Sequence, residues 1–277
     1  MKKIIILTNN QIRHHYFKII FSQVEGIEIM KTYVEGADVP LSDVQFLDES
    51  TLSNKVAQHF GARHNTEHDF FSDVIDYCED RSNSIHIRKG GVNDPEIVEE
   101  ITKLAPDLII TYGCSIIRHD LINRFNNKII NVHLGLSPYY LGAGTNFHCL
   151  VNNEFEFEGY TFMYMDKGVD TGQIIHKSRA KIFPFDNPHQ IGNRLIKQMT
   201  KEFVDLVLKF DFLEPKIAIT SVKSRIYRIA DASDERTLKL YRNFEEGAVV
   251  EYLLNRNERV EKYPLIEQPL LKNNSHS

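Results

Sequence analysis

The sequence has 277 residues, of which 42% are hydrophobic and 26% are charged, as expected for a globular protein with one large domain and room for a smaller one. Its formal net charge of -5, with no long Lys/Arg run, argues against a protein built mainly to hold nucleic acid. The first apolar run, 4–7, is too short for a signal peptide, and no stretch approaches the roughly 18 apolar residues of a membrane span. Together with three scattered cysteines, this predicts a cytoplasmic protein with reduced thiols.

Short β-branched runs alternate with amphipathic segments along most of the chain. We expect strands at 4–8, 27–34, 84–87, 108–111, 128–134, 160–165 and 173–177, and helices at 11–23, 70–76, 95–104, 116–125 and 187–209. Residues 35–60 are polar and predict no clear element. This alternation predicts the α/β class, a Rossmann-like, largely parallel twisted sheet with flanking helices.

The pattern changes near residue 205. We expect a strand at 225–229 and a helix at 234–243, with Ser233 as its N-cap. The sequence therefore predicts a main domain over 1–205 and a small C-terminal appendage over 206–277. This appendage either covers the core or forms a homodimer contact around 220–255.

Two segments carry the candidate chemistry. Asn131 and His133 lie two residues apart at the end of an expected strand, so their side chains point to the same face. Asp170 lies between glycines in the segment 168–172. An amide and a protonated imidazole can stabilise an oxyanion, and a carboxylate can accept the proton of an attacking amine or keep the imidazole charged. Together they indicate acyl transfer to an amine, although each segment alone also fits a structural pair or a turn residue.

The order of residues between these segments resembles the catalytic domain of a known family. It reads Asn131-Val-His133, then a Gly-Leu-Ser-Pro loop at 135–138, Gly142, Gly159 and finally Val169-Asp170-Thr-Gly172. This resembles the folate-dependent formyltransferases, most of all the sugar-nucleotide N-formyltransferases, closely over 105–180 and more loosely over 1–205. The resemblance implies that Asn131 and His133 stabilise the oxyanion, that Asp170 handles the proton, and that N10-formyltetrahydrofolate is the formyl donor.

The resemblance also implies where the donor binds. In relatives the pterin lies against the backbone of two loops, and backbone amides and carbonyls can read its polar edge whatever the side chains are. The matching positions are Cys114, Ser115, Ile116 and Ile117 in one loop and Asp166, Lys167, Gly168 and Val169 in the other.

The acceptor is implied less directly, by departures from the family pattern. The Gly-Leu-Ser-Pro loop replaces Ser-Leu-Leu-Pro, and no Gly-rich loop follows the first strand. Likeness to the sugar-modifying members implies a nucleotide-linked deoxyamino sugar, whose phosphate would meet basic residues and whose base or sugar would stack on tyrosines. The candidate acceptor residues are Arg13, His14, His15, Tyr139, Tyr140 and Gly142. A solvated helix start and ordinary loop packing are the alternatives for the basic residues and the tyrosines.

Other functions stay open at this point. They are a methionyl-tRNA or glycinamide ribonucleotide formyltransferase, a formyltetrahydrofolate hydrolase, and a catalytically silent folate- or sugar-binding protein. The segment after 206 is short for a tRNA-gripping barrel. His64 and His68 have helical metal-ligand spacing but lack a third ligand, so we expect no metal. His148 follows the catalytic loop and either faces the pocket or is structural, as we expect of His119 and His176. We expect no membrane or nucleic-acid partner.

Overall fold

The computed structural model describes residues 1–36, 54–213 and 224–272. In these residues the centre is a seven-stranded sheet in the order β3-β2-β1-β4-β5-β7-β8. The strands from β3 to β5 run parallel, and β7 and β8 are antiparallel to their neighbours. The strand bounds are β1 Lys2–Asn9, β2 Ile27–Glu35, β3 Ser84–Ile87, β4 Leu108–Tyr112, β5 Ile129–His133, β7 Gly159–Tyr164 and β8 Ile174–Arg179. The predicted α/β fold with a largely parallel sheet is confirmed.

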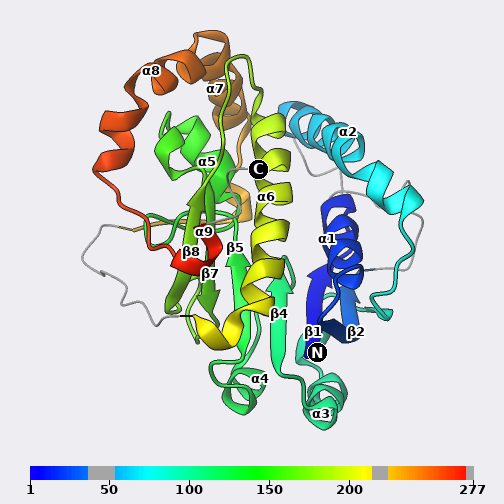
Figure 1. The fold of residues 1–277 in the computed structure, drawn as a ribbon. Coiled ribbons are helices and arrows are strands. Elements are labelled where there is room, and N and C mark those ends of the chain that lie inside the picture. The colour runs from blue at the N-terminus through cyan, green and yellow to red at the C-terminus, as the bar shows by residue number, and fades with distance from the viewer. Residues whose placement is uncertain (37–53, 214–223, 273–277) are drawn as a thin grey trace.

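Helices cover both faces of this sheet (Figure 1). Successive strand residues point to opposite faces, so Ile4 and Ile6 of β1 join one apolar cluster and Ile5 and Leu7 join the other. The first cluster lies under α1, α2 and α6, and the second lies under α3 and α4. The helix bounds are α1 Ile12–Ser22, α2 Asn54–Tyr77, α3 Pro95–Leu104, α4 His119–Arg124 and α6 Pro188–Leu208.

Helix α2 begins earlier than we predicted. The sequence indicated a helix only from residue 70, whereas α2 already begins at residue 54. Before residue 70, most of the buried side chains of α2 are polar: His59 is 8% exposed, and Glu67 is 0% exposed and accepts hydrogen bonds from Arg13 of α1, whereas Val56 is the apolar one. The apolar period that would reveal an amphipathic helix is therefore weak over 54–69.

The C-terminal region packs back onto the sheet domain. Strand β9 Arg225–Tyr227 pairs in parallel with β6 Tyr140–Gly142 in a second, two-stranded sheet. Helix α5 Thr145–Val151 lies against α7 Asp234–Glu245, which begins at the predicted cap Ser233. Helices α8 Ala248–Glu261 and α9 Pro269–Lys272 complete the region. We had not predicted β6, α5 or α8. Short 3-10 turns lie at 91–93, 155–157, 210–212 and 229–231.

Burial shows that this region covers the core. Leu240, Ala248, Val249 and Tyr252 are buried in the same cluster as α6. The segment after α8 also follows the edge strand β8, where the Lys177 amide donates to the Ile266 carbonyl at 2.7 Å. The edge of the sheet is therefore partly covered, while a dimer contact around 220–255 stays a prediction. Among the described helices, none has the length and apolar character needed to cross a membrane.

The aromatic centre of the core gives a stability prediction. Phe203 of α6 is 0% exposed, and its ring centroid lies 4.6 Å from that of Phe162 and 5.7 Å from that of Phe21. We expect Phe203→Ala to lower the free energy of unfolding by about 3–5 kcal/mol, because it leaves a cavity. Leu254→Ala, at a residue 81% exposed, should change it by less than about 0.5 kcal/mol. Denaturant unfolding of both variants measures this, and equal losses would contradict the packing described.

Candidate active site

Asn131 lies in the middle of β5, two residues before its carboxyl end, with its side-chain amide held in one orientation. Thr111, opposite it on β4, donates its hydroxyl hydrogen to Asn131 Oδ1 at 2.8 Å. The amide nitrogen therefore turns the other way, to within 3.5 Å of Asp170 Oδ1. An Nδ2 group held in this way is a hydrogen-bond donor with a fixed direction.

His133 and Asp170 form a close, mostly buried pair. His133 Nδ1 lies 3.2 Å from Asp170 Oδ2, and the two side chains are 6% and 13% exposed. The other ring nitrogen, Nε2, donates to the Tyr140 carbonyl at 2.9 Å. The Gly142 amide donates to Asp170 Oδ2 at 2.9 Å. Since both ring nitrogens face oxygen acceptors, the arrangement suits an imidazolium paired with a carboxylate.

A tight turn brings Asp170 over β5. Its φ of 55° is left-handed, a conformation that Asp tolerates better than most residues. A Cβ at Gly168 would lie 2.0 Å from Thr171 Oγ1, and one at Gly172 would lie 1.7 Å from the Tyr164 carbonyl oxygen. The glycines of the segment 168–172 are therefore required by close approach within the turn.

A cavity of about 120 Å³ opens beside these residues. Asn131 and Asp170 line it, as does every residue of the two predicted donor loops except Lys167. Lys167 lines an adjacent cavity of about 380 Å³, and the two cavities share Asp166. The sequence did not indicate Met163 and Tyr164, which also line the smaller cavity from the end of β7. The structure thus brings the predicted catalytic and donor segments together.

A buried carboxylate, Glu35, fixes one wall of this cavity. It is 3% exposed and accepts hydrogen bonds from the Gly90 amide at 2.8 Å and the Ser115 amide at 2.7 Å. Burial, together with the nearby Glu35 charge, raises the pKa of the Cys114 thiol to about 12. We did not predict this carboxylate, because its partners lie far along the chain.

The predicted basic residues Arg13, His14 and His15 all contact other side chains of the protein. Arg13 Nη1 contacts both oxygens of Glu67, at 2.9 and 3.1 Å. His14 is 1% exposed with its ring centroid 4.6 Å from that of Tyr112, and burial keeps its pKa well below the usual range. His15 Nε2 lies 2.6 Å from Asn10 Oδ1. Direct contact of Arg13 and His14 with an acceptor phosphate therefore has no geometric support.

The predicted stacking residues pack against the protein. Tyr140 is 1% exposed and stacks on Tyr227, with ring centroids 5.7 Å apart. Tyr139 lies against Phe157 with ring centroids 4.8 Å apart. Both rings therefore have packing partners within the protein, and the Gly142 amide donates to Asp170. Acceptor binding by Tyr139, Tyr140 and Gly142 stays a prediction.

Two further histidines, His148 and His176, are buried among other residues of the protein. His148 is 1% exposed, its ring stacks 4.0 Å from that of Tyr227, and burial lowers its pKa to about 4. His176 lies 3.2 Å from Glu202 and accepts from the Gln268 amide at 3.0 Å. Within 1–36, 54–213 and 224–272, no three His, Cys, Asp or Glu side chains lie close enough together to hold a metal ion. The described residues therefore give His64 and His68 no third ligand.

The fold and these contacts define an α/β protein with an Asn–His–Asp site at the carboxyl end of a parallel strand. A family model described as "Formyl transferase" matches residues 51–207, more than half of the sequence. The chain belongs to this formyl transferase family, as the resemblance predicted.

Two curated relatives match part of the chain. The methionyl-tRNA formyltransferase of Geobacter sulfurreducens is 38% identical over 118 residues, which cover 42% of this chain and 37% of that protein. The methionyl-tRNA formyltransferase of Clostridium tetani is 33% identical over 128 residues, which cover 45% of this chain and 41% of that protein. The chain therefore spans well under half of the length of these relatives.

Solved structures share the fold. A sugar N-formyltransferase from a Shewanella species aligns with a TM-score of 0.54 at 16% identity, covering 83% of this chain and 78% of that one. Phosphoribosylglycinamide formyltransferase from Anaplasma phagocytophilum aligns with a TM-score of 0.56 at 13% identity, covering 82% of this chain and 98% of that one. At these identities the likeness is one of fold.

A second buried carboxyl near the site gives a pH prediction. Glu158, just ahead of β7, is 1% exposed and accepts a hydrogen bond from the Cys149 thiol at 3.0 Å. Burial raises its pKa from an ordinary value of 4.5 to about 8. The folded chain thus keeps a proton that the unfolded chain loses between these values, so stability should fall as pH rises from 4.5 to 8, by at most about 1.4 kcal/mol per pH unit.

We expect Glu158→Gln to remove this pH-dependent contribution. The unfolding free energy of the variant should exceed that of the wild type at pH 8, and it should depend less on pH below pH 8. Unfolding by urea at several pH values measures the effect. Glu25→Gln, at an exposed position, is the control and should leave the pH dependence unchanged. Parallel curves for the wild type and Glu158→Gln would show that Glu158 is ionised in the folded chain.

Proposed function

We propose that this protein transfers a formyl group from N10-formyltetrahydrofolate to the primary amine of an amino sugar, with a nucleotide-linked deoxyamino sugar as the acceptor. The observation that carries the proposal is the contact of both Asn131 and His133 with Asp170, beside a cavity that the two donor loops line. Membership of the formyl transferase family supports the reaction class and the folate donor.

The reaction needs a positioned donor of hydrogen bonds and a proton acceptor. The amine forms a C–N bond to the formyl carbon, and the carbonyl oxygen becomes an oxyanion. Asn131 Nδ2 and the His133 imidazolium stabilise this oxyanion, each by about 3–4 kcal/mol. Asp170 accepts the proton of the attacking nitrogen, directly or through water. The C–N10 bond then breaks as the oxyanion reforms the carbonyl, N10 of tetrahydrofolate takes up the proton that Asp170 accepted, and the formamide is released.

The pairing of His133 with Asp170 couples these two roles. In the free site the carboxylate accepts from the Nδ1 side of the ring. A carboxyl group that has taken a proton is a poorer acceptor, so Nδ1–H is then released to the oxyanion as the amine loses its proton. The same pair therefore serves proton transfer and charge stabilisation in succession.

The lining of the cavity supports the donor rather than the acceptor. Both predicted donor loops line it, and Ile116 and Val169 in these loops are 73% and 47% exposed. Exposed apolar residues in loops whose backbone groups can form hydrogen bonds suit a flat heterocycle that is apolar on its faces and polar at its edge. This supports N10-formyltetrahydrofolate as the formyl donor at this place.

The charges of the C-terminal region support a small acceptor. Acidic and basic residues balance over 224–272. Arg225 pairs with Glu154 and Arg259 pairs with Glu156, so these two arginines face carboxylates of the protein instead of offering their charge to a nucleic-acid backbone. Affinity for nucleic acid comes largely from cations that neutralise phosphates.

The second candidate is methionyl-tRNA formylation. The similarity to two methionyl-tRNA formyltransferases over 118 and 128 residues favours it. It shares the donor and the chemistry of Asn131, His133 and Asp170 and differs only in the acceptor, so a direct comparison of acceptors separates the two candidates.

We expect purified protein with N10-formyltetrahydrofolate to form a formamide on at least one nucleotide-linked amino sugar. The panel contains several such sugars, initiator methionyl-tRNA, glycinamide ribonucleotide and a reaction without any amine, with products identified by mass spectrometry. Formylation of the tRNA or of the ribonucleotide alone would replace the proposed acceptor. Donor consumption without an amine would indicate a hydrolase, and tight folate binding without turnover would indicate a binding protein.

We expect Asp170→Asn to lower kcat by at least about a hundredfold, because the amide cannot accept the proton. Folate binding, followed by calorimetry, should change little because the side chain keeps its size. Asp166→Asn is the comparison: this carboxylate accepts from the Gly168 amide at 2.9 Å and from Thr171, so its loss should raise KM for the donor and spare kcat. A near-normal kcat in Asp170→Asn would assign the proton step to another group.

A further inference from the structure

The short strand β6 holds both members of the His133–Asp170 pair through its backbone. The Tyr140 carbonyl accepts from His133 Nε2 at 2.9 Å, and the Gly142 amide donates to Asp170 Oδ2 at 2.9 Å. These two contacts come from alternate residues of one three-residue strand. A shift of β6 would therefore move the imidazole and the carboxylate together.

Strand β9 fixes β6 in turn. The Arg225 amide donates to the Tyr139 carbonyl at 2.9 Å, and the Ala143 amide donates to the Tyr227 carbonyl at 2.9 Å. A Cβ on Gly142 would lie 2.2 Å from the Tyr227 carbonyl oxygen. The two backbones thus approach as closely as a glycine permits.

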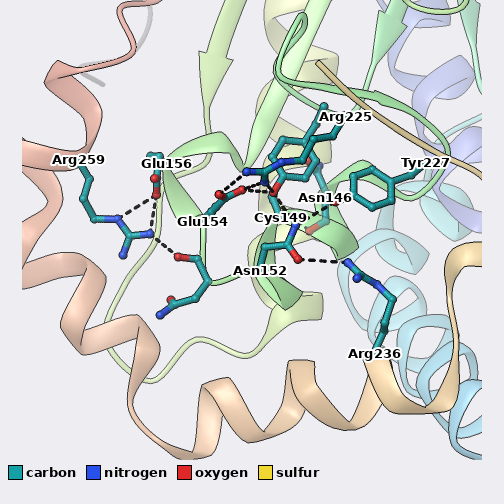
Figure 2. A network of polar contacts seen from close by, with 11 residues as sticks. Asn146, Cys149, Asn152, Glu154, Glu156, Arg225, Tyr227, Arg236 and Arg259 are labelled. Atoms are coloured by element: carbon teal, nitrogen blue, oxygen red, sulfur yellow. Dashed lines mark hydrogen bonds and ion pairs between the residues drawn. The ribbon is translucent and has the colours of Figure 1, made fainter. Parts of the chain in front are cut away.

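Side chains also join β6 and β9, and Figure 2 shows the network that they form. The Arg225 guanidinium donates to the Tyr140 hydroxyl at 2.8 Å and to Glu154 Oε1 at 2.9 Å, while the Tyr140 hydroxyl donates to Glu154. Asn152 Nδ2 donates to the hydroxyls of both Tyr140, at 2.9 Å, and Tyr227, at 3.0 Å. We call Asn152, Glu154, Arg225 and Tyr227 the β9 clasp.

We propose that the β9 clasp positions His133 and Asp170 for the reaction, with Arg225 as its main positioning residue. This inference rests on the proposed function for its effect on turnover. Arg225 touches neither catalytic side chain; it acts through Tyr140, whose hydroxyl it binds and whose carbonyl holds His133. Strand β9, which carries Arg225 and Tyr227 of the clasp, lies outside residues 51–207, the range that the family model matches.

Geometry decides the size of the effect. Proton transfer and oxyanion stabilisation need their atoms at hydrogen-bond distance, and a displacement of about 1 Å can cost a hundredfold in rate. The Arg225–Glu154 pair is partly solvent-accessible, with side chains 45% and 25% exposed, so we expect it to contribute little to global stability. Its loss should therefore act on turnover more than on unfolding.

The chain contains a matched control in the same network. Arg259 of α8 binds Glu156, with side chains 18% and 9% exposed, and donates to the Asn153 carbonyl. It also ties the C-terminal region to residues 152–158, and it is the more buried of the two arginines. Among the described residues, the hydrogen bonds of its guanidinium go to Asn153 and Glu156 and not to β6 or β9.

The test compares Arg225→Gln, Arg225→Lys and Arg259→Gln in the full chain. We expect Arg225→Gln to lower kcat by about tenfold or more with KM for the donor within about twofold, because the donor cavity does not include the clasp. Arg225→Lys should recover part of kcat, since Lys keeps the charge but loses the forked geometry. Arg259→Gln should lower Tm at least as much as Arg225→Gln and leave kcat near normal.

A second readout does not depend on turnover. In ¹⁵N-histidine NMR spectra, the His133 Nε2–H that donates to the Tyr140 carbonyl should give a protected signal in the wild type and in Arg259→Gln. The signal should be broadened or lost in Arg225→Gln. An unchanged His133 signal in Arg225→Gln, or kcat losses that follow Tm in both variants, would overturn the inference. A wild type without turnover, but with the expected NMR difference, would overturn only the proposed function.

Discussion

The rest of the site depends on one carboxylate oxygen, Asp170 Oδ2. It lies 3.2 Å from His133 Nδ1 on β5 and 2.9 Å from the Gly142 amide on β6. One atom therefore joins a central strand, a short peripheral strand and the turn that carries Asp170. Three features bring Asp170 Oδ2 to this position. They are the left-handed conformation of Asp170, the glycines that allow the turn around it, and the close pairing of β6 with β9.

The sheet and the face of the site could be predicted because their signals are local. Parallel strands buried on both faces need continuous apolar runs, and β1 and β4 provide them. Asn131 and His133 lie on one strand, so a spacing of two fixed their common face. The approach of Asp170 to His133 was predictable only through the family resemblance. Asp170 reaches His133 because β7, which precedes it, pairs with β5, and no local pattern reveals that pairing.

The parts that could not be predicted depend on polar partners far apart in the chain. Arg13 and Glu67 lie 54 residues apart, and Glu35 and Ser115 lie 80 apart. A polar residue that will be buried against such a partner has the same local sequence signature as an exposed one. For this reason the sequence indicates no helix over 54–69, offers Arg13 and His14 as candidates for ligand contact without revealing their partners in the protein, and does not reveal the pairing of β6 with β9.

The two ways in which the C-terminal region contacts the domain differ in physical kind. Tyr252 and Leu240 join the apolar cluster, where burial stabilises the fold but hardly depends on direction. Arg225, Asn152 and Tyr140 interact through hydrogen bonds, which add little net stability but restrict distance and angle. Apolar packing keeps the region on the core, and the polar contacts fix where β6 lies within it. Because β6 supplies backbone partners to both His133 and Asp170, a region outside the family match controls the geometry of the residues that define the family.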